Sequence, residues 1–81
     1  SMKKGYIQDI TLYPNPTRGI IQINGLSSLT SYRVFNTQGQ TLEAGETEGS
    51  IELSNQLNPG VYYIELNTGH SVSVFQVLKE Q

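Results

Sequence analysis

The stretch Tyr13-Pro14-Asn15-Pro16-Thr17-Arg18-Gly19 holds two of the three prolines of this chain and decides how its N-terminal part folds. Each proline holds φ near about −65° and lacks an N–H donor, and the residues before them, Tyr13 and Asn15, favour extended conformations. Asn15 and Pro16 suit the first two positions of a type I turn, and Gly19 is free to adopt a positive φ after it. The stretch therefore ends one strand and begins the next. Because prolines cannot donate to a neighbouring strand, we expect the first strand at a sheet edge.

Short apolar segments on either side of this stretch predict a hairpin. Before it, Ile10 and Leu12 share one face of a strand. After it, Ile21 and Ile23 face the core of the domain, and Asn24-Gly25 then gives a turn signal. The two segments are therefore expected to pair as antiparallel strands.

The middle of the chain repeats this pattern of strand and glycine turn. Residues 32–35 are dense in β-forming side chains, residues 36–39 predict a type I turn with its glycine last, and residues 41–44 return as a partner strand. Between the two hairpins, Leu26 and Leu29 are expected to close one end of the core.

The C-terminal half predicts further strands. The acidic, glycine-containing residues 45–49 are expected to form a surface turn, and residues 51–54 alternate apolar and polar side chains as a half-buried strand does. Pro59-Gly60 fits the central positions of a type II turn. Residues 61–66 form the most apolar strand, which we expect in the interior of a sheet, and residues 67–70 turn the chain back.

The last strand, residues 71–79, changes phase part-way along its length. Val72 and Val74 share one face, whereas Phe75 and Val77 share the other, which predicts either a bulge near Phe75 or a strand covered on both sides. In total the chain shows seven short strands separated by turns and no convincing helix. This pattern is typical of an all-β sandwich or a small barrel.

Length and composition limit the classes of protein. The 81 residues suffice for one domain, and we expect it to span residues 6–81. Residues 1–5 are expected to be a tag remnant or linker, because Ser1-Met2 resembles a cloning remnant left when a domain is excised from a longer protein. The net charge of −2 provides no basic surface for nucleic acid, and the absence of cysteine excludes disulfides. No apolar run reaches the roughly 18 residues that span a bilayer, and no secretion signal begins the chain.

The side chains offer little chemistry. The one histidine, His70, lies in an expected exposed turn and has no nucleophile pattern around it. Four carboxylates in or next to the acidic turn lack the spacing of a calcium-binding loop and are expected to form a solvated surface. These residues are Glu43, Glu46, Glu48 and Glu52. We therefore expect no enzyme activity and no catalytic, cofactor-binding or metal-binding residues.

The five tyrosines keep a carbohydrate-binding module open as an alternative. Tyr62 and Tyr63 are adjacent in one strand and so point to opposite faces, which makes Tyr13 the better exposed candidate. The simpler explanation is that tyrosines cover the edges of a small core while their hydroxyl groups reach water. A row of exposed coplanar rings would favour the carbohydrate-binding alternative.

Taken together, the turns and strands resemble the type A C-terminal sorting domain of the type IX (Por) secretion system. The resemblance spans roughly residues 10–79 and departs from the family midway along the last strand, where Phe75-Gln76 replaces a common basic residue. The carrying segments are Leu12-Tyr13-Pro14-Asn15-Pro16-Thr17-Arg18-Gly19 with Ile21 and Ile23, Tyr32-Arg33-Val34-Phe35-Asn36 with Gly39, Ile51-Glu52-Leu53-Ser54, Leu57, Gly60-Val61-Tyr62-Tyr63-Ile64, and Val77-Leu78-Lys79.

This resemblance implies a seven-stranded antiparallel immunoglobulin-like β-sandwich that is not an enzyme. Such a domain follows an N-terminal cargo in a Gram-negative bacterium and directs it from the periplasm through the outer-membrane translocon. A sortase-like signal peptidase then removes the domain, with the cut expected at or before Ser1-Met2. The cargo finally reaches the cell surface or the medium.

We expect recognition to depend on rigid, exposed backbone features rather than on reactive side chains. The hypothesis is that the translocon reads the terminal strand and nearby turns, so that deleting the last five residues leaves a fused reporter in the periplasm. An immunoglobulin-like spacer or carbohydrate-binding module of a secreted enzyme is the alternative function. The family-motif residues expected to carry recognition are Tyr13, Pro14, Asn15, Pro16, Gly19, Gly39, Leu57, Gly60, Tyr62, Val77, Leu78 and Lys79.

Overall fold

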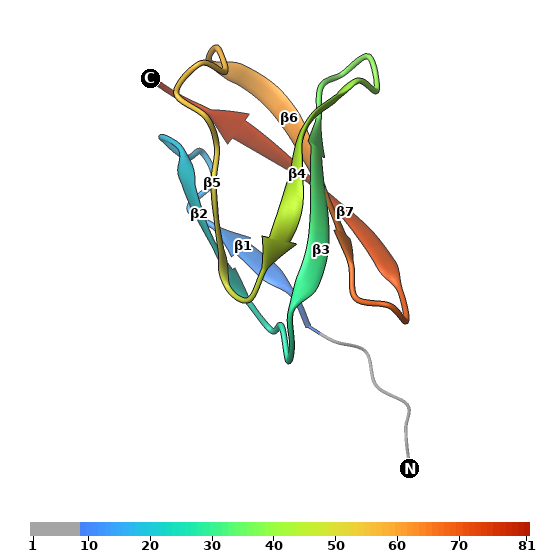
Figure 1. Ribbon diagram of the computed structural model, residues 1–81. Coiled ribbons are helices and arrows are strands. Elements are labelled where there is room, and N and C mark those ends of the chain that lie inside the picture. Colours follow the sequence, from blue (N-terminus) through green and yellow to red (C-terminus); the bar gives the residue numbers. More distant parts are fainter. Residues whose placement is uncertain (1–8) are drawn as a thin grey trace.

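The computed structural model describes residues 9–81 and shows two antiparallel β-sheets (Figure 1). One sheet has the strand order β1-β2-β5 and the other has the order β4-β3-β6-β7. This arrangement confirms the predicted all-β fold with seven strands, and it is a sandwich rather than a closed barrel. The strands are β1 (Thr11–Tyr13), β2 (Ile20–Asn24), β3 (Thr30–Phe35), β4 (Thr41–Thr47), β5 (Ser50–Glu52), β6 (Gly60–Asn67) and β7 (Val72–Lys79).

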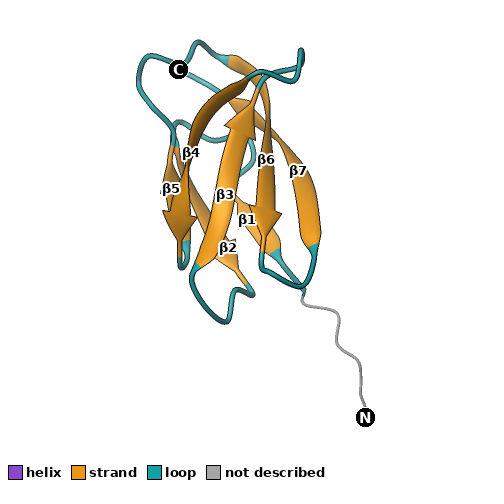
Figure 2. Ribbon diagram, turned by 45° about the vertical axis from the view of Figure 1, so that its right-hand side comes forward, coloured by secondary structure: helices purple, strands orange, loops and turns teal. Residues whose placement is uncertain are grey.

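Loops join the strands at the two ends of the sandwich, as Figure 2 shows. Nothing within residues 9–81 forms a helix long and apolar enough to cross a membrane. The expected tag remnant and the start of the domain at residue 6 lie outside the described residues.

The core forms where alternate side chains of the two sheets meet. Along β2 the burial pattern alternates strictly, so the predicted inward orientation of Ile21 and Ile23 is confirmed. Burying a side chain of this size contributes about 1.5–3 kcal/mol each. Leu26 packs against the core as expected, whereas Leu29 is exposed and does not close it. The buried apolar residues are Ile21, Ile23, Val34, Ile51, Leu53, Tyr62, Ile64, Leu66 and Val77.

The strand positions confirm two further predictions. β1 pairs only with β2, from Thr11 opposite Asn24 to Tyr13 opposite Gln22, and therefore lies at a sheet edge. β6 lies between β3 and β7, which agrees with its apolar sequence. A strand with neighbours on both sides and a core below it has little contact with water, and this favours apolar residues.

The connection between β1 and β2 differs from the prediction. No backbone hydrogen bond closes a turn at Asn15-Pro16, where a type I turn is expected. The Tyr13–Pro14 and Asn15–Pro16 peptide bonds are both cis. Asn15 and Thr17 of this segment bond to β7 in the opposite sheet.

β4 is longer than predicted, because residues 45–47 continue the strand instead of turning. Gly45 lies opposite Tyr32, and a Cβ atom there would lie 3.2 Å from the tyrosine ring. The glycine thus makes room for the ring inside a regular ladder. The actual turn is short: Thr47 Oγ1 accepts from the N–H groups of Gly49 and Ser50 at 3.1 and 3.0 Å.

The predicted type II turn at Pro59-Gly60 is also absent. Gly60 is the first residue of β6 and pairs with Lys79. The hydrogen-bonded turn lies earlier, where Leu57 N–H donates to the Ser54 carbonyl at 3.1 Å. Pairing with β7 extends the strand back to Gly60, so the proline precedes the strand rather than forming the turn.

β7 shows neither of the two features predicted from its change of phase. Its register with β6 runs without a shift from Val72 to Lys79, so there is no bulge near Phe75. It is not covered on both sides either, because Val72 and Val74 are 56% and 53% exposed. β7 is an edge strand with an apolar outer face.

Candidate recognition surface

Most of the predicted motif residues lie at one end of the sandwich. In Figure 1 the β1–β2, β3–β4 and β5–β6 connections and the C-terminus all lie at the upper end, whereas β1 begins at the lower end. We call the upper end, formed by residues 14–19, 36–40, 53–59 and 77–81, the distal end. Segments far apart in the sequence therefore lie at the same end of the sandwich.

Asn15 attaches the β1–β2 connection to β7 through its side chain. Its Nδ2 donates to the Gln76 carbonyl at 3.1 Å, and its Oδ1 accepts from the Leu78 N–H at 3.0 Å. The amide therefore binds the outer edge of β7 as the peptide group of a neighbouring strand would. This role explains why asparagine suits the position between two prolines, which cannot donate through their own nitrogens.

Thr17 continues the attachment through its backbone. Its N–H donates to the Leu78 carbonyl at 2.8 Å and its carbonyl accepts from the Glu80 N–H at 2.7 Å, which forms a parallel bridge opposite Lys79. The side chain is buried, and Oγ1 donates to the Ile20 carbonyl at 2.8 Å while it accepts from the Gly19 N–H at 3.1 Å. Thr17 thus joins β2 of one sheet to β7 of the other. Sequence reasoning did not single out this residue, because nothing in its type marks a link between sheets.

Gly19 and Gly60 belong to strand pairs rather than to isolated turns. The Gly19 carbonyl accepts from the Leu53 N–H at 2.7 Å, which prolongs the pairing of β2 with β5. Gly60 has φ +155° opposite Lys79, and nothing lies within 4 Å of the place where a Cβ atom would be. The requirement for glycine at position 60 is therefore conformational, since residues with a side chain rarely adopt this φ.

Tyr62 and Leu57 hold the β5–β6 connection against the core. The Tyr62 ring is buried and its hydroxyl group donates to the Asn58 carbonyl, four residues earlier. A tyrosine near the start of a strand that bonds back to the preceding connection is a feature of immunoglobulin-like sandwiches. Leu57 is half-buried and packs on the same core.

Of the remaining motif residues, three alternate along β7 and Tyr13 lies on β1 in the other sheet. Val77 is buried, Leu78 is 42% exposed on the outer side, and Lys79 is buried at the end of the strand. Tyr13 is 46% exposed at the end of β1, and its hydroxyl group lies 3.5 Å from Asn24 Oδ1. The side chains that point outward from the distal end are thus apolar or neutral for the most part.

Gly39 closes the β3–β4 turn as predicted. Its N–H donates to the Asn36 carbonyl at 3.0 Å, and Asn36 Oδ1 accepts from the N–H groups of Gln38 and Gln40 at 2.9 and 3.0 Å. This turn lies at the distal end, but it belongs to the other side of the four-stranded sheet from β7. The structure does not bring Gly39 into contact with the other motif residues.

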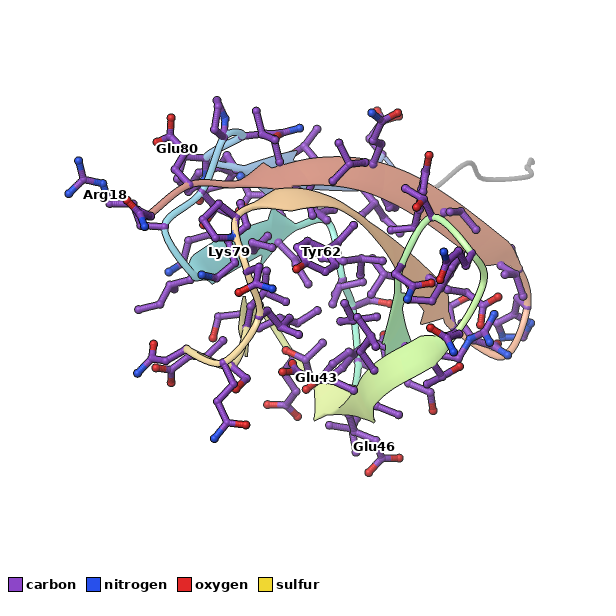
Figure 3. All side chains as sticks on the ribbon, turned by 90° about the horizontal axis from the view of Figure 1, so that it is seen from above. Arg18, Glu43, Glu46, Tyr62, Lys79 and Glu80 are labelled. Atoms are coloured by element: carbon purple, nitrogen blue, oxygen red, sulfur yellow. The ribbon has the colours of Figure 1, made fainter. Side chains whose placement is uncertain are left out.

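A hollow of about 560 Å³ opens beside the β1–β2 connection. Pro14, Pro16 and Gly19 line one side of it, and Glu52 and Glu80 contribute carboxylates. Figure 3 shows Arg18 and Glu80 projecting outward at this end of the molecule. The hydroxyl group of Thr17, which also lines the hollow, donates to the Ile20 carbonyl.

The acidic residues of β4 and β5 do not converge. Within residues 9–81 no group of three or more histidine, aspartate or glutamate side chains is placed to hold a metal ion. Glu43 Oε2 instead accepts from the Ser54 N–H at 2.9 Å and so joins β4 to the segment after β5, in the opposite sheet. Figure 3 shows Glu46, on the same strand, projecting away from the domain. Glu43 is therefore a structural residue and not part of a uniformly solvated surface, contrary to expectation.

Aromatic side chains do not form a flat row in the described part of the chain. Phe35 and Tyr63 stack on each other on the outer face of the four-stranded sheet, with ring centroids 5.6 Å apart. Arg33 lies 4.7 Å from the Phe35 ring and forms an ion pair with Glu65 at 3.3 Å. Tyr13 belongs to the other sheet. The observation that would favour a carbohydrate-binding module is thus missing from residues 9–81.

The sequence model of one protein family, described as the secretion system C-terminal sorting domain, matches residues 11–80. The chain belongs to this family. The match covers both sheets and every motif residue discussed above. No curated protein matches the chain.

Membership in this family defines the general role of the domain. A C-terminal sorting domain is the signal that commits the protein carrying it to type IX secretion, so it implies a cargo and the secretion machinery. The destination is the cell surface or the surrounding medium, and the family indicates a non-enzymatic sorting tail.

Proposed function

We propose that this sorting domain carries an N-terminal cargo from the periplasm of a Gram-negative bacterium through the outer-membrane type IX translocon. A sortase-like signal peptidase then removes the domain by cutting on its N-terminal side, and the cargo is anchored at the surface or released. The observation that carries the proposal is the family match over residues 11–80, together with the gathering of most motif residues at the distal end.

The direction of the chain supports a separation between the end that is recognised and the end that is cleaved. β1 begins at the end of the sandwich opposite the distal end, so the chain enters the described part of the domain far from most of the motif residues. The distal end is then free to meet the secretion machinery while the cut site stays on the cargo side. A compact signal with two separate ends can be held at one end and processed at the other.

Recognition in this proposal depends on shape. The distal end presents backbone held in place by Asn15 and Thr17, together with the outward side chain of Leu78. A rigid surface loses little conformational entropy when it binds, which favours affinity without a large charge or a reactive group. An immunoglobulin-like relationship of the fold is part of the same proposal, and the Tyr62 contact with Asn58 supports it.

The test is export of a reporter fused ahead of residues 1–81 in a bacterium with a working type IX system. We expect the reporter outside the outer membrane in the competent strain and inside the periplasm in a strain without the translocon. Equal export of the reporter without the sorting domain would contradict the proposal.

Two leucines make this test specific to the recognition surface. Leu78 and Leu42 are 42% and 40% exposed, so serine at either position removes a similar apolar area. Leu78 lies at the distal end and Leu42 on the opposite edge strand, β4. We expect Leu78→Ser to lower export several-fold while Leu42→Ser leaves it near the wild-type level, with equal thermal stability for both variants.

A further inference from the structure

The sandwich has four edge strands, and three of them are protected against pairing with another chain. β1 and β5 are each three residues long, and β1 leads directly into Pro14. β4 contains a register shift opposite Val34 and Phe35 and carries the exposed Glu46. Short length, proline, irregular pairing and charge are the usual means by which proteins prevent edge-to-edge association.

β7 is the exception. It has eight residues in unbroken register with β6 and contains no proline and no charged residue before Lys79. Its distal half is covered, because Asn15 and Thr17 bond to Gln76, Leu78 and Glu80. The half that begins at Val72 has no such cover from residues 9–81.

The direction of the uncovered backbone groups follows from these same contacts. Gln76 and Leu78 direct their outer carbonyl and N–H groups toward Asn15 and Thr17, away from β6. Backbone groups alternate in direction along an antiparallel strand, so Val72 and Val74 direct theirs to the same side. No hydrogen bond of residues 9–81 reaches these outward groups. They form an open edge.

The side chains at this open edge are apolar. Val72 and Val74 are both more than half exposed on the outer face of the sheet. The residue opposite Val74 on β6 is Glu65, whose carboxylate is already paired with Arg33 at 3.3 Å. Within residues 9–81, the edge thus offers unpaired backbone groups and two valine side chains, opposite a carboxylate that is already paired.

We propose that the edge of β7 at residues 72–74 binds an extended, uncharged strand of a partner protein of the secretion machinery; this inference rests on the proposed function above. The partner strand supplies N–H and C=O groups to Val72 and Val74 and lays apolar side chains beside theirs. It ends before Gln76, whose outward carbonyl already accepts from the Asn15 amide.

The open edge is too short to hold a second copy of the chain by itself. Pairing two copies through so few residues buries far less than the roughly 1,000 Å² that a stable interface requires. A partner that also contacts the distal end gains that area, because β7 runs without interruption from the open edge to Leu78 at that end.

The test uses three substitutions at Val74 in the full chain fused to the export reporter. Val74→Pro removes the outward N–H, which no strand of the domain uses, and an edge position tolerates proline on its free side. Val74→Lys keeps the N–H but places a charge at the edge, which opposes strand addition. Val74→Thr, the matched control, keeps the N–H and the preference for a strand.

We expect Val74→Pro and Val74→Lys to lower export at least tenfold, with Val74→Thr close to wild type and all three domains folded by circular dichroism. If Val74→Pro does not fold, Val74→Lys decides the question, because this side chain is 53% exposed and its replacement leaves the core intact. Export of both folded variants at the level of Val74→Thr overturns strand addition but leaves the proposed function standing. Equal losses in all three variants also overturn it, and failure of the wild-type fusion overturns both.

Discussion

The Asn15 side chain donates to the Gln76 carbonyl and accepts from the Leu78 N–H, and so substitutes for a neighbouring strand at the distal half of β7. Few side chains can substitute for a peptide group, because this requires a donor and an acceptor with the spacing found in a primary amide. Aspartate keeps the acceptor but places a carboxylate against the Gln76 carbonyl. Asparagine at position 15 therefore suits the bonds to β7, between prolines that lack a backbone N–H.

At the scale of single residues, we expect Asn15→Ala to lower the free energy of unfolding by about 1–2 kcal/mol. Two hydrogen bonds at an exposed site are lost, and water replaces them in part. Asn55→Ala is the matched control, because Asn55 is exposed and its side chain makes no hydrogen bond within residues 9–81. Urea denaturation measures both, and the control should stay within about 0.5 kcal/mol of wild type. Equal effects of the two substitutions would show that the Asn15 amide does not stabilise the fold.

At the scale of elements, β4 and the segment after β5 belong to different sheets and are joined by the Glu43 carboxylate, which accepts from the Ser54 N–H at 2.9 Å. We expect Glu43→Ala to cost about 1–2 kcal/mol of stability, because it leaves a partly buried N–H without a partner. Glu46→Ala, on the exposed side of the same strand, should cost less than about 0.5 kcal/mol. Thermal unfolding of the two variants makes the comparison, and equal midpoints would contradict a structural role for Glu43.

For the whole molecule, the end of β7 serves the fold as well as recognition. Residues 77–81 contain the buried Val77, and Leu78 and Glu80 within them bond to Thr17. A domain of this size has only about 4–12 kcal/mol of stability, so losing a core residue and the link between sheets removes much of it. We expect deletion of residues 77–81 to abolish cooperative unfolding in urea, whereas deletion of residues 80–81 leaves it intact.

This expectation changes the meaning of the truncation experiment that the sequence motivates. A reporter carrying the five-residue deletion should remain in the periplasm, but because the domain unfolds and not because a contact with the translocon is lost. A deletion of residues 77–81 that still unfolds cooperatively would contradict this reasoning and restore the truncation as a test of recognition. The substitutions at Leu78 and Val74 avoid the problem, because both side chains face outward.

The sequence by itself determined the fold class, the edge position of β1, the central position of β6 and the identity of the inward residues of β2, because these follow from local properties. Alternation of apolar side chains, the missing N–H of proline and the φ of glycine act within a few residues. Only the tertiary structure decided that the Pro14–Gly19 segment bonds to β7, that Gly60 begins a strand, and that Glu43 joins the two sheets. Each of these contacts joins residues distant in the chain or depends on strand register, so neighbouring residues in the sequence do not reveal it. The free energy of these contacts outweighs the local turn preferences. The open edge of β7 is also a feature that only the tertiary structure decided, since an edge is defined by the strands beside it and not by its own sequence.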